Sequence, residues 1–101
     1  MTLTGKAKLD FEKWLNKEMY YLGRHHFADR DNNIEDLSDN FQNALIIEWF
    51  DSVGIIITSD YFELNKGFYS EILDSNFAIV KPIRQEALTE AIKKANEYYN
   101  L

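Results

Sequence analysis

Apolar side chains recur at helical spacing near the start of the chain and predict a first helix over about residues 5–22. The repeating positions are Ala7, Phe11, Trp14, Leu15 and Leu22. A spacing of three or four residues places such side chains on one face of a helix. Thr4 is a suitable N-cap, because its hydroxyl is able to accept a hydrogen bond from a free backbone N–H. Gly23 is a suitable residue to end the helix.

The next apolar pattern predicts a loop followed by a second helix. Residues 24–36 show no sustained period and are rich in turn formers, so this stretch is predicted to be a loop. The helical period returns at Leu37 and continues to Gly54. Its apolar positions are Phe41, Ala44, Leu45, Ile46, Ile47, Trp49 and Phe50. A helix that is apolar nearly all round belongs in the middle of the core.

Three short β-branched and aromatic runs predict an antiparallel meander. Residues 55–64 and 68–73 read as a hairpin, with Gly67 able to adopt the left-handed conformation of a three-residue turn. A second turn at 74–76 leads to a third strand over 77–80. Pro82 follows and closes that strand.

A final amphipathic helix completes a single α+β domain that spans residues 1–101. Its apolar face consists of Ala87, Leu88, Ala91, Ile92, Ala95 and Tyr99. The predicted order is therefore α-α-β-β-β-α, with helices packed on a three-stranded antiparallel sheet. The side chains expected to be buried together are Trp14, Phe41, Leu45, Trp49, Ile57, Leu88 and Ile92.

Composition supports one folded core and indicates a reducing compartment. Hydrophobic residues make up 46% of the chain and aromatic residues 15%, which argues against disorder. Cysteine is absent, so disulfides and thiolate metal sites are excluded. No apolar stretch has the length of a signal peptide core or a membrane span. We therefore expect a cytoplasmic protein with no membrane partner.

The acidic residues are concentrated in the middle of the chain. The formal net charge is −6, and residues 27–80 contain 11 of the 17 acids but only two of the 11 basic residues. Such a charge repels phosphate backbones, so no direct nucleic-acid binding is expected. A basic protein surface is the better electrostatic partner. The alternative is that the acids only keep the domain in solution.

The residues that could carry catalysis or bind a metal form no recognised site. His25 and His26 are adjacent, and adjacent side chains diverge instead of chelating one ion. Asp29, Asp31 and Asn33 match the start of a calcium-binding EF-hand loop. The glycine and the bidentate glutamate that the loop requires further along are missing. We therefore predict no metal and no cofactor.

Glu48 is the acid with the strongest case for a catalytic role, because it interrupts the apolar run of the second helix. It could serve a small hydrolase or a ligand-binding enzyme, or it could lie at the edge of the helix for structural reasons. No nucleophile elbow, phosphate-binding glycine loop or zinc-protease motif is present. The favoured class is therefore a binding protein and not an enzyme.

Two surfaces are candidates for partner binding. The first is the acidic loop with the aromatic residues before it, because loops on rigid helices often carry function. It consists of Tyr20, Tyr21, Asp29, Asp31, Glu35, Asp36 and Asp39. The alternative is the hairpin, with Tyr61, Phe62, Phe68 and Tyr69. These aromatic residues could instead only cover the core.

Three separated blocks of sequence are similar to a group of known proteins. They are Thr4-Gly5-Lys6-Ala7 with Phe11-Glu12-Lys13-Trp14, the run from Trp49 to Ile55, and Arg84-Gln85-Glu86-Ala87 with the run from Lys94 to Asn100. Together they resemble small uncharacterised phage and prophage proteins of Bacteroidota. The resemblance implies no catalytic residues. The chain departs from the pattern at residues 24–36 and at Ile83, where a serine or threonine cap is expected.

A phage context implies three possible roles. The first is an inhibitor of host defence that acts in the bacterial cytoplasm. Anti-CRISPR proteins are examples, and they occupy a nuclease or its guide-binding surface. The acidic charge agrees with this role because enzymes that handle nucleic acid present basic surfaces. The alternatives are the small enzyme described above and a structural or replication accessory subunit.

Overall fold

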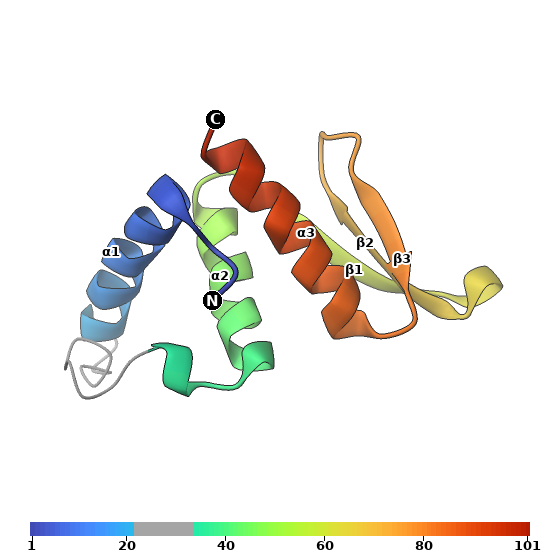
Figure 1. Ribbon diagram of the computed structural model, residues 1–101, viewed down its shortest axis with the longest axis horizontal. Helices are drawn as coiled ribbons and strands as arrows, with labels where there is room; N and C mark the ends of the chain where they lie inside the picture. The colour runs from blue at the N-terminus through green and yellow to red at the C-terminus, as the bar shows by residue number, and fades with distance from the viewer. Residues whose placement is uncertain (22–33) are drawn as a thin grey trace.

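The fold follows the predicted order of helices and strands. A computed structural model describes residues 1–21 and 34–101 (Figure 1). The elements are α1 (Gly5–Tyr21), the 3-10 helix η2 (Ile34–Asp36), α2 (Asp39–Ser52), β1 (Ile57–Phe62), the 3-10 helix η3 (Glu63–Asn65), β2 (Gly67–Ile72), β3 (Ala78–Lys81) and α3 (Arg84–Tyr99). The α+β class and the α-α-β-β-β-α order are confirmed. No helix in the described ranges combines the length and apolarity needed to cross a membrane.

The sheet is an antiparallel meander in the order β1-β2-β3. Alternate residues along each strand point to opposite faces. The inner face includes the buried Ile57, Ser70 and Ile72. The outer face carries Thr58, Asp60, Phe62, Tyr69, Glu71, Ala78 and Val80, none of which is buried. The sheet is therefore covered by the core on one face only.

Helix α3 is the central element, because it contacts α1, α2 and all three strands. Ala87, Ala91 and Ala95 are fully buried along one side of it. The same side carries Arg84, whose guanidinium lies 5.0 Å from the ring centre of Phe68 on β2. The alanine stripe therefore faces the sheet, where small side chains let a helix approach a strand closely. Figure 1 shows α3 running between α2 and the strands.

Aromatic rings fill the core between α1, α2 and α3. The Trp49 ring lies 5.8 Å from Phe11, 4.8 Å from Phe50 and 4.9 Å from Tyr99, centre to centre. Leu45, Trp49, Ile57 and Ile92 are buried as predicted, while Trp14 and Leu88 are partly buried against the same cluster.

The prediction that Phe41 lies in the core is wrong. Its side chain is 46% exposed, whereas the neighbouring Gln42 and Asn43 are buried. The buried stripe of α2 passes through Gln42, Ile46 and Trp49, which places Phe41 on its edge. Gln42 tolerates burial because its Nε2 donates to the carbonyl of Leu37 at 2.9 Å. The apolar pattern alone could not show that two amides replace apolar residues on this face.

The segment before α2 is more ordered than a loop prediction implies. Ile34 in η2 is buried and belongs to the main core cluster. Ser38 caps α2, since its hydroxyl accepts a hydrogen bond from the Phe41 N–H at 3.3 Å. Gly54 follows the helix with a φ of +86°, which agrees with its predicted role in ending the helix. Gly23, His25 and His26 lie outside the described residues.

The two ends of the chain are joined by side-chain amides. Asn96 Oδ1 accepts from the Thr4 N–H at 2.9 Å, and Asn100 Oδ1 accepts from the Ala7 N–H at 2.8 Å. The amide nitrogens donate to Thr4 Oγ1 at 3.0 Å and to its carbonyl at 2.9 Å. Thr4 directly precedes α1, where an N-cap residue lies, and a cap bond by its hydroxyl stays a prediction. Asn100, which follows α3, thereby provides an acceptor for one free N–H group in the first turn of α1.

Matched phenylalanines on α2 test this packing. Phe50→Ala should lower the free energy of unfolding by about 3–5 kcal/mol, because Phe50 is fully buried. Phe41→Ala should change it by less than about 1 kcal/mol. Urea unfolding monitored by circular dichroism measures both values. Equal losses in the two variants would contradict the placement of α2.

A second pair of variants tests the junction of the chain ends. Asn100→Ala removes one acceptor and one donor and should cost about 1–2 kcal/mol of unfolding free energy. Asn40→Ala is the control, since the Asn40 side chain is exposed on α2 and makes no hydrogen bond in the described part of the chain. The same urea titration gives both values. No difference between the two variants would mean that the junction does not stabilise the fold.

Candidate binding surfaces

The β1–β2 hairpin presents two aromatic pairs, one on each face. Tyr61 and Phe68 are directly opposite in the register, with ring centres 5.4 Å apart in an edge-to-face arrangement. Phe62 and Tyr69 pair diagonally on the outer face at 6.2 Å. Tyr61 is 55% exposed, Phe62 39% and Leu64, at the turn, 87%. These side chains support one another and remain accessible to a partner.

The hairpin projects beyond the helices at one end of the molecule (Figure 1). Its turn contains η3, and the residue that adopts the left-handed conformation is Lys66, with a φ of 48°. The prediction that Gly67 does so is wrong. Gly67 is needed for a different reason, because a Cβ there would lie 2.9 Å from the Lys81 carbonyl oxygen and 3.0 Å from Val80 Cγ1. The glycine lets β3 approach the base of the turn.

The outer face of the hairpin combines its aromatic rings with carboxylates. Tyr69 Oη donates to Glu71 Oε2 at 2.9 Å. This hydrogen bond, together with partial burial and the nearby negative charge, raises the pKa of Tyr69. Tyr69 therefore remains a neutral donor at physiological pH. Asp60 lies opposite Tyr69 in the register and is exposed.

The predicted acidic-loop surface is only partly described. Asp29 and Asp31 lie outside the described residues, as do the side chains of Tyr20, Tyr21 and Asp36. Glu35 is exposed, and its Oε1 lies 3.8 Å from the N-terminal ammonium of Met1. Asp39 is exposed in the first turn of α2. The clustering of these residues into one surface stays a prediction.

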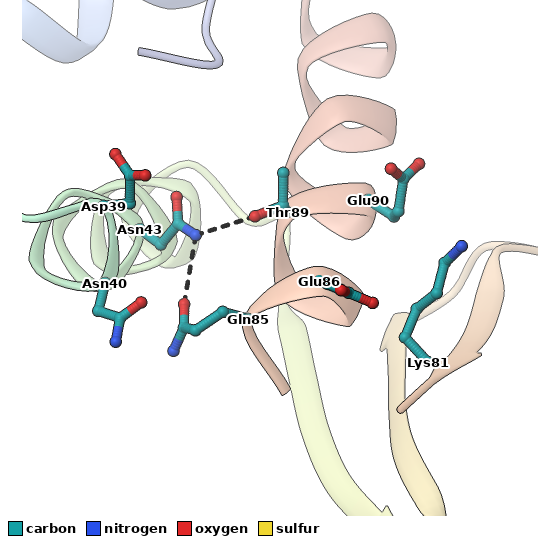
Figure 2. Close-up of a pocket in the computed structure, with 8 residues that line it drawn as sticks. All are labelled: Asp39, Asn40, Asn43, Lys81, Gln85, Glu86, Thr89 and Glu90. Carbon is teal, nitrogen blue, oxygen red and sulfur yellow. Dashed lines mark hydrogen bonds between the residues drawn. The ribbon is translucent and has the colours of Figure 1, made fainter. Parts of the chain in front are cut away.

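Asp39 belongs instead to a polar groove that sequence reasoning did not identify. The groove has a volume of about 350 Å³ and is formed by α2, α3 and the end of β3 (Figure 2). Its lining residues are Asp39, Asn40, Asn43, Lys81, Gln85, Glu86, Thr89 and Glu90. Polar residues on both helices, outside their apolar faces, are the only sequence signal for it.

Asn43 on α2 forms hydrogen bonds to α3 across this groove. Its buried Nδ2 donates to Thr89 Oγ1 at 3.2 Å and to Gln85 Oε1 at 3.4 Å, as the dashed lines in Figure 2 show. These groups satisfy one another, so they fix the position of α3 on α2. The groove is lined mainly by amides and carboxylates.

Glu48, the candidate catalytic acid, is exposed on α2 and does not line the groove. Its position agrees with the structural alternative, in which it lies at the solvent-exposed edge of the helix.

Among residues 1–21 and 34–101, no group of three histidine, cysteine or acidic side chains is placed to hold a metal ion. No protein-family model, curated protein or solved structure matches the chain.

The close approach at Gly67 can be tested directly. Gly67→Ala should lower the free energy of unfolding by about 1–3 kcal/mol, because the new methyl group must push β3 away from β2. Amide exchange at Lys81 and Val80 should accelerate more than exchange in α1. Unchanged exchange at β3 would show that the glycine is not required there.

Proposed function

We propose that this chain is a protein-binding domain that docks through its β1–β2 hairpin on a basic surface of an enzyme that handles nucleic acid. The observation that carries the proposal is the exposure of Tyr61 and Phe62, which lie on a projecting hairpin instead of entering the core. A small domain has little reason to expose paired aromatic rings unless another surface covers them.

The chemistry of the hairpin suits a protein interface. Tyrosine and phenylalanine bury a large area while losing few rotatable bonds. The pairs Tyr61–Phe68 and Phe62–Tyr69 already restrict these rings, so less entropy is lost when a partner binds. The aromatic pairs are therefore suitable central anchors.

The charge around these anchors selects a basic partner. Between Ile57 and Val80 the chain carries four acids and one base: Asp60, Glu63, Glu71, Asp74 and Lys66. This local excess has the same sign as the net charge of −6. Opposite charges accelerate association and disfavour partners of the same charge.

The specific partner we propose is a bacterial defence nuclease, and a CRISPR effector is the first target to test. The resemblance to phage proteins suggests this context, and the proposed location is the cytoplasm of the host cell. A basic guide- or substrate-binding surface is the kind of surface that an acidic, aromatic hairpin complements. The chain would inhibit the enzyme by occupying that surface, without a catalytic step of its own.

Partner capture followed by binding kinetics tests the proposal. The immobilised chain is incubated with lysates of CRISPR-bearing bacteria, and captured nucleases are purified and tested for inhibition. Tyr61→Ala combined with Phe62→Ala should weaken binding at least about tenfold, mainly by faster dissociation. Association should slow as salt rises. Failure of purified CRISPR effectors and other nucleases to bind the chain would contradict the proposal.

A variant of the acidic loop separates the two candidate surfaces. Asp31→Lys, Glu35→Lys and Asp36→Lys together should slow association if the loop docks on the partner. We expect only the modest slowing caused by the altered net charge, because the hairpin carries the contact. A larger loss of affinity than in the Tyr61 and Phe62 variant would assign the interface to the loop.

Glu48→Gln tests the enzyme alternative. Because Glu48 is exposed on α2 and is not part of the hairpin, inhibition of the partner should remain within about twofold of the wild-type value. Loss of inhibition in a variant with an unchanged melting temperature would favour a catalytic role for this acid.

A further inference from the structure

We infer that the outer face of the sheet docks a basic segment of the partner, with an arginine side chain lying between Phe62, Tyr69, Asp60 and Glu71. The inference rests on the proposed function in taking the partner to be a basic protein. It goes further by naming the recognised side chain and the face that receives it.

The strand register brings the four side chains together. Asp60 is directly opposite Tyr69. Because the strands are antiparallel, Phe62 lies two residues from Asp60 toward the turn, and Glu71 lies two residues from Tyr69 in the opposite direction. Directly opposite residues have Cβ atoms about 5 Å apart, and diagonal neighbours remain within reach of long side chains. Two aromatic rings and two carboxylates therefore form a diagonal row on the outer face, with Asp60 and Tyr69 between Phe62 and Glu71.

The rings provide a surface on which a guanidinium group can stack. Phe62 is 39% exposed and Tyr69 is partly exposed, so part of the ring surface of this pair is open to solvent. The protein already uses this contact on its inner face, where the Arg84 guanidinium lies 5.0 Å from the centre of the Phe68 ring. Arginine stacks on aromatic rings more readily than lysine because its charged group is planar and weakly hydrated.

The carboxylates provide acceptors that are still available. Tyr69 occupies Oε2 of Glu71 and thereby fixes the orientation of this carboxylate. Within the described ranges, Glu71 Oε1 and the Asp60 carboxylate have no hydrogen-bond or ion-pair partner. Glu71 is partly buried, so an ion pair there is screened less than one at a fully exposed position. A planar guanidinium is able to donate to both acids at once.

Charge decides among the possible occupants of this face. A second copy of the chain would bring Asp60 and Glu71 close to the same acids of its partner, which is destabilising. Nucleic acid would place phosphates beside these carboxylates. A basic peptide segment is the occupant that offers the opposite charge and covers the rings.

Peptide titration followed by NMR tests the inference, because a short basic peptide stands in for the docking segment of the partner. The probes are three synthetic peptides of the same sequence that carry arginine, lysine or the neutral isostere citrulline at two positions. The arginine peptide should shift the amide signals of residues 58–62 and 69–71. It should bind at least about fivefold more tightly than the lysine peptide, and the citrulline peptide should bind least.

Matched single-charge variants separate this face from general electrostatics. Glu71→Gln should weaken binding of the arginine peptide about tenfold, and Asp60→Asn should also weaken it. Glu90→Gln removes the same charge from α3 and should leave binding within about twofold of wild type. Melting temperatures confirm folding, and Asp60 is exposed, so its variant keeps the test valid if Glu71→Gln is unstable.

Three results would overturn the inference: equal losses in Glu71→Gln and Glu90→Gln, equal affinity for the arginine and lysine peptides, or shifts centred on the helices. The outcome is distinguishable from failure of the proposed function. If a captured nuclease binds through Tyr61 and Phe62 but its affinity is unchanged by Asp60→Asn and Glu71→Gln, the proposed function stands and the arginine site does not. If only the peptides bind, the site stands and the nuclease partner does not.

Discussion

The packing of α3 against both halves of the molecule is the constraint on which the rest of the structure depends. Its alanine stripe faces the sheet, while Tyr99 contacts Trp49 on α2 and donates to Asp10 on α1 at 2.6 Å. Asn96 and Asn100, near the end of the chain, accept hydrogen bonds from the N–H groups of Thr4 and Ala7 at the start of α1. The final helix therefore contacts α1, α2 and all three strands. Folding must bring the two ends of the chain together.

This arrangement explains why a binding surface is available. Helix α3 contacts all three strands on the inner face of the sheet, and in the described part of the chain no residue of the outer face is buried. The hairpin also extends past the helices, so Tyr61 is more than half exposed although its strand begins in the core at Ile57. The core fixes the base of the hairpin, and the aromatic residues near its turn do not contribute to the core.

Much of the fold could be predicted from the sequence because apolar periodicity reports local structure. It located α1, α2, α3 and the meander, and Pro82 marked the end of β3 correctly. The pattern failed where contacts between residues distant in the sequence determine the position of a side chain. Phe41 is exposed because Gln42 and Asn43 take the buried positions on α2. The hydrogen bonds from Asn96 and Asn100 to the start of α1, and the close approach of β3 to Gly67, are also invisible to the apolar pattern.

The candidate site shows the same division. The hairpin aromatic residues could be identified from the sequence, whereas their pairing on two faces and the Tyr69–Glu71 hydrogen bond depend on the strand register.

Cross-saturation NMR on the complex with a captured nuclease tests the central claim most directly, because it marks the residues in contact with the partner. We expect attenuated signals at residues 58–62 and 67–71. Attenuation centred on Glu35, Asp39 and the groove between α2 and α3 would contradict the account.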